Sequence, residues 1–392
     1  MKNILISSFD MEVGGVERSL VSMLNNFDYD NYNVDLMLYS HTGDFMELLP
    51  DKPNLLKEDK AYKTFRMPIK DVFKSGKIGI GLARLIAKIN ANWNLEGESG
   101  YIQMQYMWKY ALPFLPNSNK EYDVAISYLW PHYYVADKVK AKKKIAWIHT
   151  DYSTIETDIN MDLKMWRKFD YIISISEECT RAFIKKYPEL KDKIRLVENI
   201  TSPDFVISRS NEIVEDDIRN ELGFKVVSTG RICYQKAFDL AVKALKELHN
   251  RGLSDIKWYV VGYGSDEGLI RELIKENNLE NSFILLGKKI NPYPYMKASD
   301  TYVQPSRYEG KAVTVTEARI LGKPTIITNY PTAKSQLTEG VDGVICDLSI
   351  EGIANGIEKL YKNIDLRNEL INNCSNIDYS NNSELENLYE LF

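Results

Sequence analysis

The chain has 392 residues, of which 44% are hydrophobic and 27% are charged. This length is too great for one compact core and favours two domains of roughly 150 to 200 residues each. The formal net charge of −5 supplies no overall positive field, which argues against a protein that binds nucleic acid.

The spacing of the cysteines and the lengths of the apolar segments indicate the cellular compartment of the protein. The four cysteines form no Cys-x-x-Cys pair, which argues against a structural zinc site and against a disulfide framework. The N-terminus lacks an apolar run of signal-peptide length, and no segment reaches the ~20 apolar residues of a membrane-spanning helix. We therefore expect a cytoplasmic protein.

Short β-type runs alternate with helical patterns along the chain, which is typical of parallel sheets with crossover helices. The first half contains six predicted strands: Asn3–Phe9, Val34–Tyr39, Asp123–Tyr128, Lys144–His149, Tyr171–Ser176 and Ile194–Glu198. The second half contains six more: Lys225–Thr229, Trp258–Gly262, Ser282–Leu286, Thr301–Pro305, Pro324–Thr328 and Gly343–Cys346. Helices are predicted from about Gly15, over Ala237–His249 and over Ser383–Phe392.

These elements predict an α/β protein with two Rossmann-like parallel-sheet domains facing a cleft, where ligands bind at the carboxyl ends of the strands. The predicted N-terminal acceptor-binding domain is 1–203, and the nucleotide-binding domain is 204–377. The boundary falls near Thr201–Glu215, where Thr-Ser-Pro-Asp interrupts regular structure and a polar acidic run follows. The C-terminal helix within 378–392 is too short to persist alone. We expect it to return to the N-terminal domain.

Two regions are rich in lysine. Lys52–Lys88 contains ten Lys or Arg residues against three acidic ones, interleaved with apolar side chains, and Lys138–Lys144 contains five lysines. One interpretation is a surface for anionic lipid head groups, which would place the protein at the inner face of the cell membrane. The other is solvated helices with ordinary apolar faces.

A first motif follows the predicted strand Lys225–Thr229. A glycine permits a tight turn, Arg231 comes at the strand's carboxyl end, and Lys236 lies near the start of the next helix. An arginine fork and a lysine point charge neutralise a diphosphate leaving group without a metal. A solvated pair of loop cations would have the same spacing.

A second motif follows the predicted strand Thr301–Pro305. Glu309 lies in the loop, Gly310 permits close backbone approach, and the amides of residues 310–313 are expected to begin a helix that binds an anion. Glu317, eight residues after Glu309, is expected about two turns into that helix. Carboxylates beside an anion site favour hydroxyl ligands, and a nucleotide sugar has a diphosphate between two polyols.

The chain resembles the retaining glycosyltransferases of the GT-B fold, the glycosyl transferases group 1 family. Glu309 to Glu317 matches the family's Glu-x7-Glu signature, and Gly-Arg231 with Lys236 matches its Gly-Arg-x4-Lys-Gly motif. Further matches are the glycine loop at Gly14 and Gly15, the strand-end histidine in Trp147-Ile-His149, and the turns at Gly262-Tyr-Gly264 and Leu286-Gly287.

The resemblance implies a role for each of these residues. Arg231 and Lys236 would hold the diphosphate, Glu309 the donor-sugar hydroxyls and Glu317 the ribose. His149 would lie against the donor sugar near the acceptor. The amides of Lys311, Ala312 and Val313 and the loop of Gly14 and Gly15 would also face the phosphates. Lys288 and Lys289, which follow Gly287, would border the base. Gly262, Gly287 and Gly310 are expected to bind the donor as well.

The resemblance also implies the reaction. It would be a metal-independent hexosyl transfer with retention, without a cofactor, in which the leaving phosphate oxygen helps to deprotonate the acceptor hydroxyl. The donor would be UDP-linked, and the acceptor a glycan, a cell-wall polymer or a lipid-linked molecule. The run from Glu309 through Pro324-Thr-Ile-Ile-Thr-Asn-Tyr-Pro is similar to the branch that serves bacterial capsule and cell-wall polysaccharides.

Two positions depart from the family pattern. Ala237 stands where the family usually has glycine, which is tolerable unless the position requires a positive φ. Lys311-Ala312 stand where Phe-Gly is common, which bears on the identity of the donor. Two alternatives stay open: a non-catalytic relative that only binds a nucleotide sugar, and a nucleotide-sugar epimerase of similar architecture.

Overall fold

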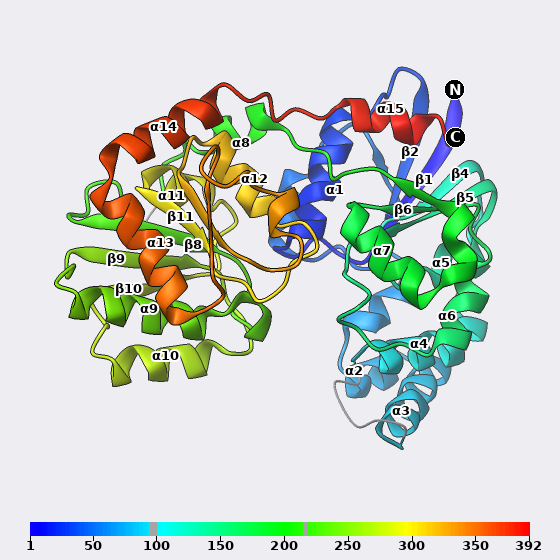
Figure 1. Ribbon diagram of the computed structural model, residues 1–392. Coiled ribbons are helices and arrows are strands. Elements are labelled where there is room, and N and C mark those ends of the chain that lie inside the picture. Colours follow the sequence, from blue (N-terminus) through cyan, green and yellow to red (C-terminus); the bar gives the residue numbers. More distant parts are fainter. Residues whose placement is uncertain (94–99, 215–217) are drawn as a thin grey trace. The chain divides into compact units, whose positions relative to one another are not determined.

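The computed structural model describes residues 1–93, 100–214 and 218–392. The chain forms two compact units, shown in Figure 1. The first unit comprises Met1–Glu12, Val16–Ile200 and Asn382–Phe392, and the second comprises Val13–Gly15 and Thr201–Asn381. The predicted boundary segment contains helix α8 (Pro203–Arg209), and its last residue, Glu215, lies outside the described residues.

The first unit is built on a parallel seven-stranded sheet in the order β3-β2-β1-β4-β5-β6-β7. Its strands are β1 (Lys2–Ser8), β2 (Tyr32–Leu38), β3 (Asn54–Leu55), β4 (Glu121–Ser127), β5 (Lys140–Ile148), β6 (Tyr171–Ser174) and β7 (Ile194–Leu196). Strand β1 pairs with β2 on one side and with β4 on the other, so the strand order reverses there.

Helices cover this sheet, and the hydrophobic core lies between the helices and the strands. They are α1 (Gly15–Asn26), α2 (Ile69–Lys74), α3 (Ile78–Trp93), α4 (Gly100–Ala111), α5 (Tyr133–Lys138), α6 (Ile159–Trp166), α7 (Glu177–Lys186) and α15 (Ser383–Tyr389), with 3₁₀ turns η1 (Asp44–Leu48), η2 (Tyr62–Arg66), η3 (Leu112–Phe114) and η4 (Pro188–Lys193). The core is rich in aromatic side chains: Trp108 of α4 is fully buried and stacks on Phe65 with ring centroids 4.3 Å apart. The segment η2–α2–α3–α4 fills the long connection between β3 and β4.

The second unit is built on a parallel six-stranded sheet in the order β10-β9-β8-β11-β12-β13. Its strands are β8 (Phe224–Thr229), β9 (Ile256–Val261), β10 (Phe283–Gly287), β11 (Thr301–Gln304), β12 (Thr325–Thr328) and β13 (Val344–Cys346). Its helices are α8, α9 (Phe238–Asn250), α10 (Glu267–Glu276), α11 (Tyr293–Ala298), α12 (Val313–Ile320), α13 (Ile350–Lys362) and α14 (Ile364–Ser375), with 3₁₀ turns η5 (Tyr234–Lys236) and η6 (Ala333–Ser335). The two-sheet α/β architecture predicted from the sequence is confirmed.

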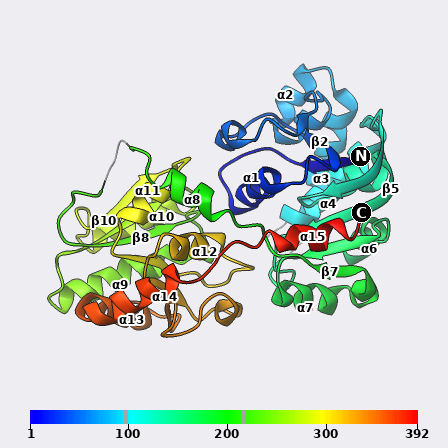
Figure 2. The same cartoon turned by 90° about the horizontal axis from the view of Figure 1, so that it is seen from above.

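The C-terminal helix α15 packs on the first unit, as the sequence predicted. Its Leu385 and Leu388 are buried. Tyr389 and Phe392 join an aromatic cluster with Phe27 and Tyr32, with ring centroids 4.9 to 6.3 Å apart. The chain ends lie close together in Figures 1 and 2, because Nζ of Lys2 donates to the carbonyl oxygen of Phe392 at 3.1 Å.

Two side chains near the start of α15, Asn381 and Glu384, accept hydrogen bonds from the segment that joins the two units. The amide of Thr201 donates to Oδ1 of Asn381 at 2.8 Å, at the two ends of the second unit. In the first unit, the amide of Glu198 donates to Oε2 of Glu384 at 2.9 Å. Each pair joins residues that lie about 180 positions apart in the chain.

Candidate donor site and acceptor pocket

The second sheet reverses its strand order at β8, which pairs with β9 on one side and with β11 on the other. Loops leave neighbouring strands in opposite directions at such a point, and ligands of open α/β sheets bind in the crevice outside the carboxyl ends. The β8–α9 loop carries Arg231 and Lys236, and the β11–α12 loop carries Glu309. The fold therefore brings the two predicted motifs to one edge of the sheet.

Lys236 and Glu309 form an ion pair at this edge, with 2.6 Å between Nζ and Oε1. Only 16% of the lysine side chain and 7% of the glutamate side chain are exposed. The carboxylate also accepts hydrogen bonds from Ser306 Oγ at 2.6 Å and from Gln304 Nε2 at 3.1 Å, both on Oε1, and from Gln235 Nε2 at 3.3 Å on Oε2. These donors fix the orientation of the carboxylate, and burial strengthens each interaction.

Gly230 leaves room for the lysine of this pair. A Cβ atom at Gly230 would lie 3.2 Å from Cε of Lys236, so any larger residue would crowd the lysine chain. Arg231, the next residue, is exposed, and its guanidinium makes no ion pair with any described residue. Its charge is therefore available to a ligand at the strand end.

The glycines after β9 permit direct contact between two loops. A Cβ atom at Gly262 would lie 1.9 Å from the carbonyl oxygen of Gly230, and one at Gly264 would lie 2.1 Å from that of Ile232. The amides of Gly230 and Ile232 donate to Val261 and Tyr263 across this contact, each at 3.0 Å. The geometry explains the glycine at position 262 as a close backbone approach that positions Arg231; its predicted contact with the donor stays a prediction.

Ala237 has the left-handed conformation that the family's glycine would favour, with φ 53° and ψ 35°. It precedes the first residue of α9, directly after Lys236, and is fully buried. The departure from glycine therefore carries backbone strain, because the Cβ atom disfavours this region. Its small side chain still fits the space between the loop and the helix.

Helix α12 begins later than the sequence predicted. It starts at Val313 because Ala312 is extended (φ −76°, ψ 97°), and the amide of Ala312 donates to Oε1 of Gln336 at 2.9 Å. Of the segment 310–313, the Ala312 amide is thus already satisfied by protein. Among the described residues no side chain caps the helix. The amide of Val315 donates to the carbonyl oxygen of Ala312 at 3.0 Å, so the amides of Val313 and Thr314 are the ones at the helix start that keep their capacity to bind an anion.

Glu317 lies in the second turn of α12 rather than two turns in, because the helix starts at Val313. It is 2% exposed, and its Oε1 accepts a hydrogen bond from the hydroxyl group of Tyr293 at 2.8 Å. A buried carboxylate with a tyrosine partner is preoriented to accept hydroxyl donors. Gly310 and Lys311 lie in the loop between Glu309 and the helix.

Two further predicted residues follow β10 at the same edge of the sheet. The strand ends at Gly287, which has φ 74°. Nζ of Lys288 lies 5.3 Å from the ring centroid of Tyr263, and Nζ of Lys289 lies 6.0 Å from that of Tyr295. Both lysines therefore add positive charge beside aromatic faces.

Sequence reasoning missed the polar side chains that support the ion pair. Gln235, Gln304 and Ser306 donate hydrogen bonds to Glu309. Arg307 donates to Asp239 through both terminal guanidinium nitrogens, at 2.7 and 2.9 Å. Ser306 and Arg307 lie in the loop after β11, within three residues of its end, and this position was a usable signal. The Arg307–Asp239 pair joins residues 68 positions apart, and no local pattern indicates it.

His149 is the predicted site residue of the first unit, and it directly follows β5 as expected. Both ring nitrogens are buried, and neither has a hydrogen-bond partner among the described residues. Burial lowers the pKa of His149 to about 3, so the imidazole is neutral. An orphaned buried ring at a strand end is unusual for a purely structural histidine.

The N-terminal glycines belong to the segment Val13–Gly15. Gly15 is the first residue of α1 and is exposed, and a Cβ atom there would meet nothing within 4 Å. Local packing therefore does not require glycine at position 15. Its assignment to the donor, and that of Gly14, rests on the resemblance.

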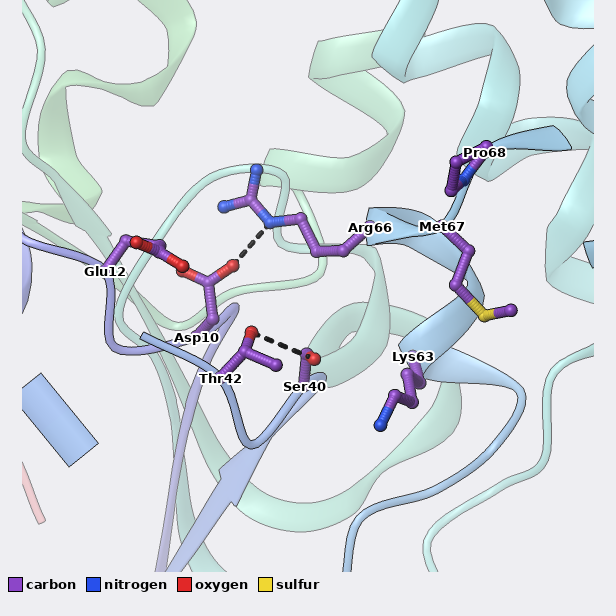
Figure 3. A pocket seen from close by; sticks show the side chains of 8 residues that line it. All are labelled: Asp10, Glu12, Ser40, Thr42, Lys63, Arg66, Met67 and Pro68. Atoms are coloured by element: carbon purple, nitrogen blue, oxygen red, sulfur yellow. Dashed lines mark hydrogen bonds and ion pairs between the residues drawn. The ribbon is translucent and has the colours of Figure 1, made fainter. Parts of the chain in front are cut away.

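A separate pocket of about 480 Å³ lies at the carboxyl ends of β1 and β2, wholly within the first unit (Figure 3). Asp10, Glu12, Ser40, Thr42, Lys63, Arg66, Met67 and Pro68 line it. Asp10 is buried and pairs through Oδ2 with Nε of Arg66 at 2.5 Å. Figure 3 shows the two terminal nitrogens of Arg66 turned away from this contact.

Backbone contacts join the two loops after β1 and β2 that line the pocket. The amide of Met11 donates to Thr42, and the amide of Phe45 donates to Met11, each at 2.9 Å. Gly43 has φ 103°, and a Cβ atom there would lie 2.2 Å from backbone atoms of Met11. Paired charges and hydroxyl groups on a fixed backbone suit a ligand with many hydroxyl groups.

Comparisons with known proteins agree with this architecture. The chain superposes on a solved structure of Anabaena HepE in complex with UDP-glucose with a TM-score of 0.70 at 16% identity, covering 100% of both chains. With its two Rossmann-like parallel-sheet units, the protein has the GT-B fold.

The family match lies in the second unit. Residues 210–376 match the family model Glycosyl transferases group 1, so the chain carries a domain of that family. An uncharacterized glycosyltransferase of Methanocaldococcus jannaschii is 30% identical over 170 residues, or 43% of this chain and 42% of that protein. The amylovoran biosynthesis glycosyltransferase AmsD of Erwinia amylovora is 28% identical over 132 residues, or 34% of this chain and 36% of that protein. The chain thus matches less than half of either relative.

Proposed function

We propose that the protein is a glycosyltransferase that moves a sugar, with retention and without a metal ion, from a UDP-linked donor to a carbohydrate acceptor. The observation that carries the proposal is the buried Lys236–Glu309 pair at the strand-order reversal of the second sheet. A cation, a fixed carboxylate and an uncapped helix start together suit a diphosphate that is bonded to a sugar.

The donor site divides the work between cations and carboxylates. Arg231 and Lys236 stabilise the negative charge that develops on the leaving diphosphate, as a metal ion does in other enzymes. Glu309 accepts hydrogen bonds from the donor-sugar hydroxyls, and Glu317 accepts them from the ribose. Lys288 and Lys289 border the base, and the loop at Lys311 borders the phosphates. The oxygen of the leaving phosphate takes the acceptor's proton as the new bond forms on the same face.

We further propose that the pocket of the first unit binds the acceptor. Arg66 and Lys63 offer donors, while Asp10, Ser40 and Thr42 offer acceptors and hydroxyl groups. This mixture suits one sugar unit of a glycan, a cell-wall polymer or a lipid-linked acceptor. The relationship to the amylovoran enzyme supports the polysaccharide branch.

The donor can be identified by thermal unfolding in the presence of UDP-sugars, with GDP- and ADP-sugars as controls. A donor at 100 times its Kd stabilises the fold by about 2.7 kcal/mol. We expect a UDP-sugar to raise Tm, and loss of this shift in Lys236→Ala. A shift of equal size with all nucleotides would contradict selective donor binding.

Transfer itself is tested with Lys236→Ala and Glu309→Gln. The matched control is Lys243→Ala, because Lys243 is an exposed lysine of α9, the helix that follows the loop of Lys236. Loss of one electrostatic contact to the leaving group raises the barrier by about 2.7–4 kcal/mol. We expect transfer rates to fall at least a hundredfold in both site variants and to stay normal in the control. Normal turnover of Glu309→Gln would refute its role.

The same assay separates the two alternatives. A protein that only binds the nucleotide sugar would show the Tm shift, yet product analysis would find the donor intact in the presence of every acceptor tested. An epimerase would convert the donor sugar without an acceptor. We expect conversion only when the acceptor is present.

A further inference from the structure

Helix α3 of the first unit presents an apolar stripe to solvent. Ile78, Leu82, Leu85, Ile86 and Ile89 are between 43% and 60% exposed. With 3.6 residues per turn, these five side chains fall within roughly 100° of the helix circumference. A contiguous exposed patch of large aliphatic side chains is uncommon on monomeric proteins and marks an interaction surface.

The opposite face of α3 explains why the stripe is held outward. Ile80, Ala83 and Ala87 are buried in the core of the first unit. Arg84 turns inward, where NH1 donates to the carbonyl oxygens of Thr64 and Met67, the latter at 2.6 Å. The helix is therefore anchored by one face, and its apolar stripe has no freedom to turn away from solvent.

An aromatic side chain extends the stripe. Phe114 is 56% exposed, and a Cβ atom at Gly79 would lie 2.7 Å from its ring, so the ring lies over this glycine of α3. In Figure 1, α2, α3 and α4 lie together at one end of the first unit, and α15 lies at the other end. Among the described residues no helix has the length and apolar content to cross a membrane, so the stripe belongs to a surface helix.

Three of the four lysines beside the stripe have no ion-pair partner among the described residues. Lys70 of α2, Lys77 at the start of α3 and Lys88 of α3 form no ion pair with any described residue, and Lys74 lies 3.7 Å from Asp71. Lysine stems cover apolar surface while their charges reach outward. The stripe therefore has a positive border.

The second lysine-rich region differs in this respect. Lys140 pairs with Glu121 at 3.1 Å and Lys142 with Asp123 at 2.7 Å. Lys143 donates to the carbonyl oxygens of Leu391 and Phe392, and Lys144 to that of Ala136. Carboxylates and carbonyls of the protein thus occupy these four lysines, and this region does not offer a positive surface of the same kind.

We propose that the stripe of α3, with Phe114 and the lysines at positions 70, 77 and 88, docks the first unit on an anionic lipid bilayer. An apolar helix face enters the head-group region while neighbouring lysines contact lipid phosphates. The positive border selects this occupant over a second copy of the chain, because two identical faces would bring their lysines together. The docking surface needs neither donor nor transfer, so it stands apart from the proposed function.

The location of the surface relates it to the acceptor pocket. The 3₁₀ turn η2, which supplies Lys63 and Arg66 to the pocket, leads directly into α2, and Arg84 of α3 binds carbonyls of this segment. If the pocket binds the acceptor as proposed, docking through α3 holds it near molecules anchored in the membrane. A lipid-linked acceptor is then favoured over a free glycan.

Cosedimentation of the full chain with vesicles tests the proposal. We expect binding to vesicles of phosphatidylcholine mixed with phosphatidylglycerol, little binding to phosphatidylcholine alone, and weaker binding at high salt. Leu82→Gln with Ile86→Gln keeps helix propensity and removes the stripe's centre, and we expect it to abolish binding. Lys77→Gln with Lys88→Gln should weaken it about thirtyfold, from roughly 1 kcal/mol per lysine.

The matched control is Lys140→Gln with Lys142→Gln, which removes the same charge from the paired region and should leave vesicle binding unchanged. Circular dichroism and the thermal unfolding transition of the first unit verify that each variant is folded. Absence of binding to anionic vesicles would overturn the proposal. A solution dimer that Leu82→Gln with Ile86→Gln dissociates would assign the stripe to a second copy instead.

Discussion

At the residue scale, Ala237 combines backbone strain with a position beside the candidate site. It lies between Lys236 and helix α9 in the left-handed region, which costs an L-residue about 1–2 kcal/mol. Strained residues persist where the surrounding structure fixes them, and they concentrate at functional sites. Here the turn directs Lys236 back toward Glu309 before the helix begins.

Ala237→Gly should relieve this strain. The gain is reduced by the greater entropy of glycine in the unfolded chain, which is about 0.4–1 kcal/mol, so we expect a net stabilisation of about 0.5–1 kcal/mol in urea unfolding. Asn278 also has a positive φ of 54°, but asparagine tolerates this region, so Asn278→Gly should gain less. A loss of stability in Ala237→Gly would show that the methyl group's packing outweighs the strain.

Two buried histidines should make the first unit sensitive to acid. Burial lowers the pKa values of His132 and His149 to about 3, against 6.5 for the unfolded chain. Between these values the unfolded state binds protons that the native state does not, so stability falls as pH decreases below about 6.5. Each histidine contributes a slope of about 1.4 kcal/mol per pH unit.

His149→Asn tests this dependence. Between about pH 7.5 and about pH 5.5, the wild-type protein should lose about 1.4 kcal/mol more unfolding free energy than the variant. Urea unfolding at the two pH values gives this difference. Equal losses in both proteins would mean that His149 is protonated in the native state.

At the element scale, local patterns predicted most of the sheets. All twelve predicted strands are present, within a few residues at each end. Strand β3 (Asn54–Leu55) has two residues and is too short for alternation to show. The start of α12 was wrong by about three residues, because Gln336, 24 positions away, holds the amide of Ala312.

Local patterns likewise predicted which residues belong to the candidate site, but not which of them contact each other. Glycine, arginine, lysine and glutamate at fixed distances after strands indicated Arg231, Lys236 and Glu309, because parallel topology gathers strand ends. Gln304 lies only five residues before Glu309 and is a local neighbour. The direct Lys236–Glu309 contact and the hydrogen bond from Gln235 depend instead on which strands are neighbours. That information is tertiary, so no local pattern contains it.

Contact between the β8 and β9 loops gives a prediction for these elements. Gly264→Ala should destabilise the second unit by about 1–3 kcal/mol, because the new methyl group would overlap the carbonyl oxygen of Ile232. Gly268→Ala in α10 meets no neighbour and should stabilise the helix by about 0.5–1 kcal/mol. Urea unfolding distinguishes the opposite signs. A neutral Gly264→Ala would show that the loops separate easily.

At the scale of the whole molecule, the first unit is completed by the end of the chain. Removing Asn382–Phe392 deletes three buried leucines and two rings of the aromatic cluster around Phe27. Burial of each such side chain contributes about 1.5–3 kcal/mol, so the truncated first unit should lose about 4 kcal/mol or more. Thermal unfolding should show a lower Tm for the transition of the first unit. The donor-induced shift of the second unit should persist, and an unchanged first transition would contradict the packing.

The hydrogen bond between Thr201 and Asn381 brings together the two ends of the main segment of the second unit. This segment, Thr201–Asn381, is continuous in sequence and begins and ends at neighbouring positions in space. It can therefore be excised as one piece. The remaining sequence can be rejoined by a short bridge from Ile200 to Asn382, since Glu198 and Glu384 are also adjacent. If the second unit binds the nucleotide sugar as proposed, exchanging it at this junction for the corresponding unit of a relative separates the choice of sugar from the choice of acceptor.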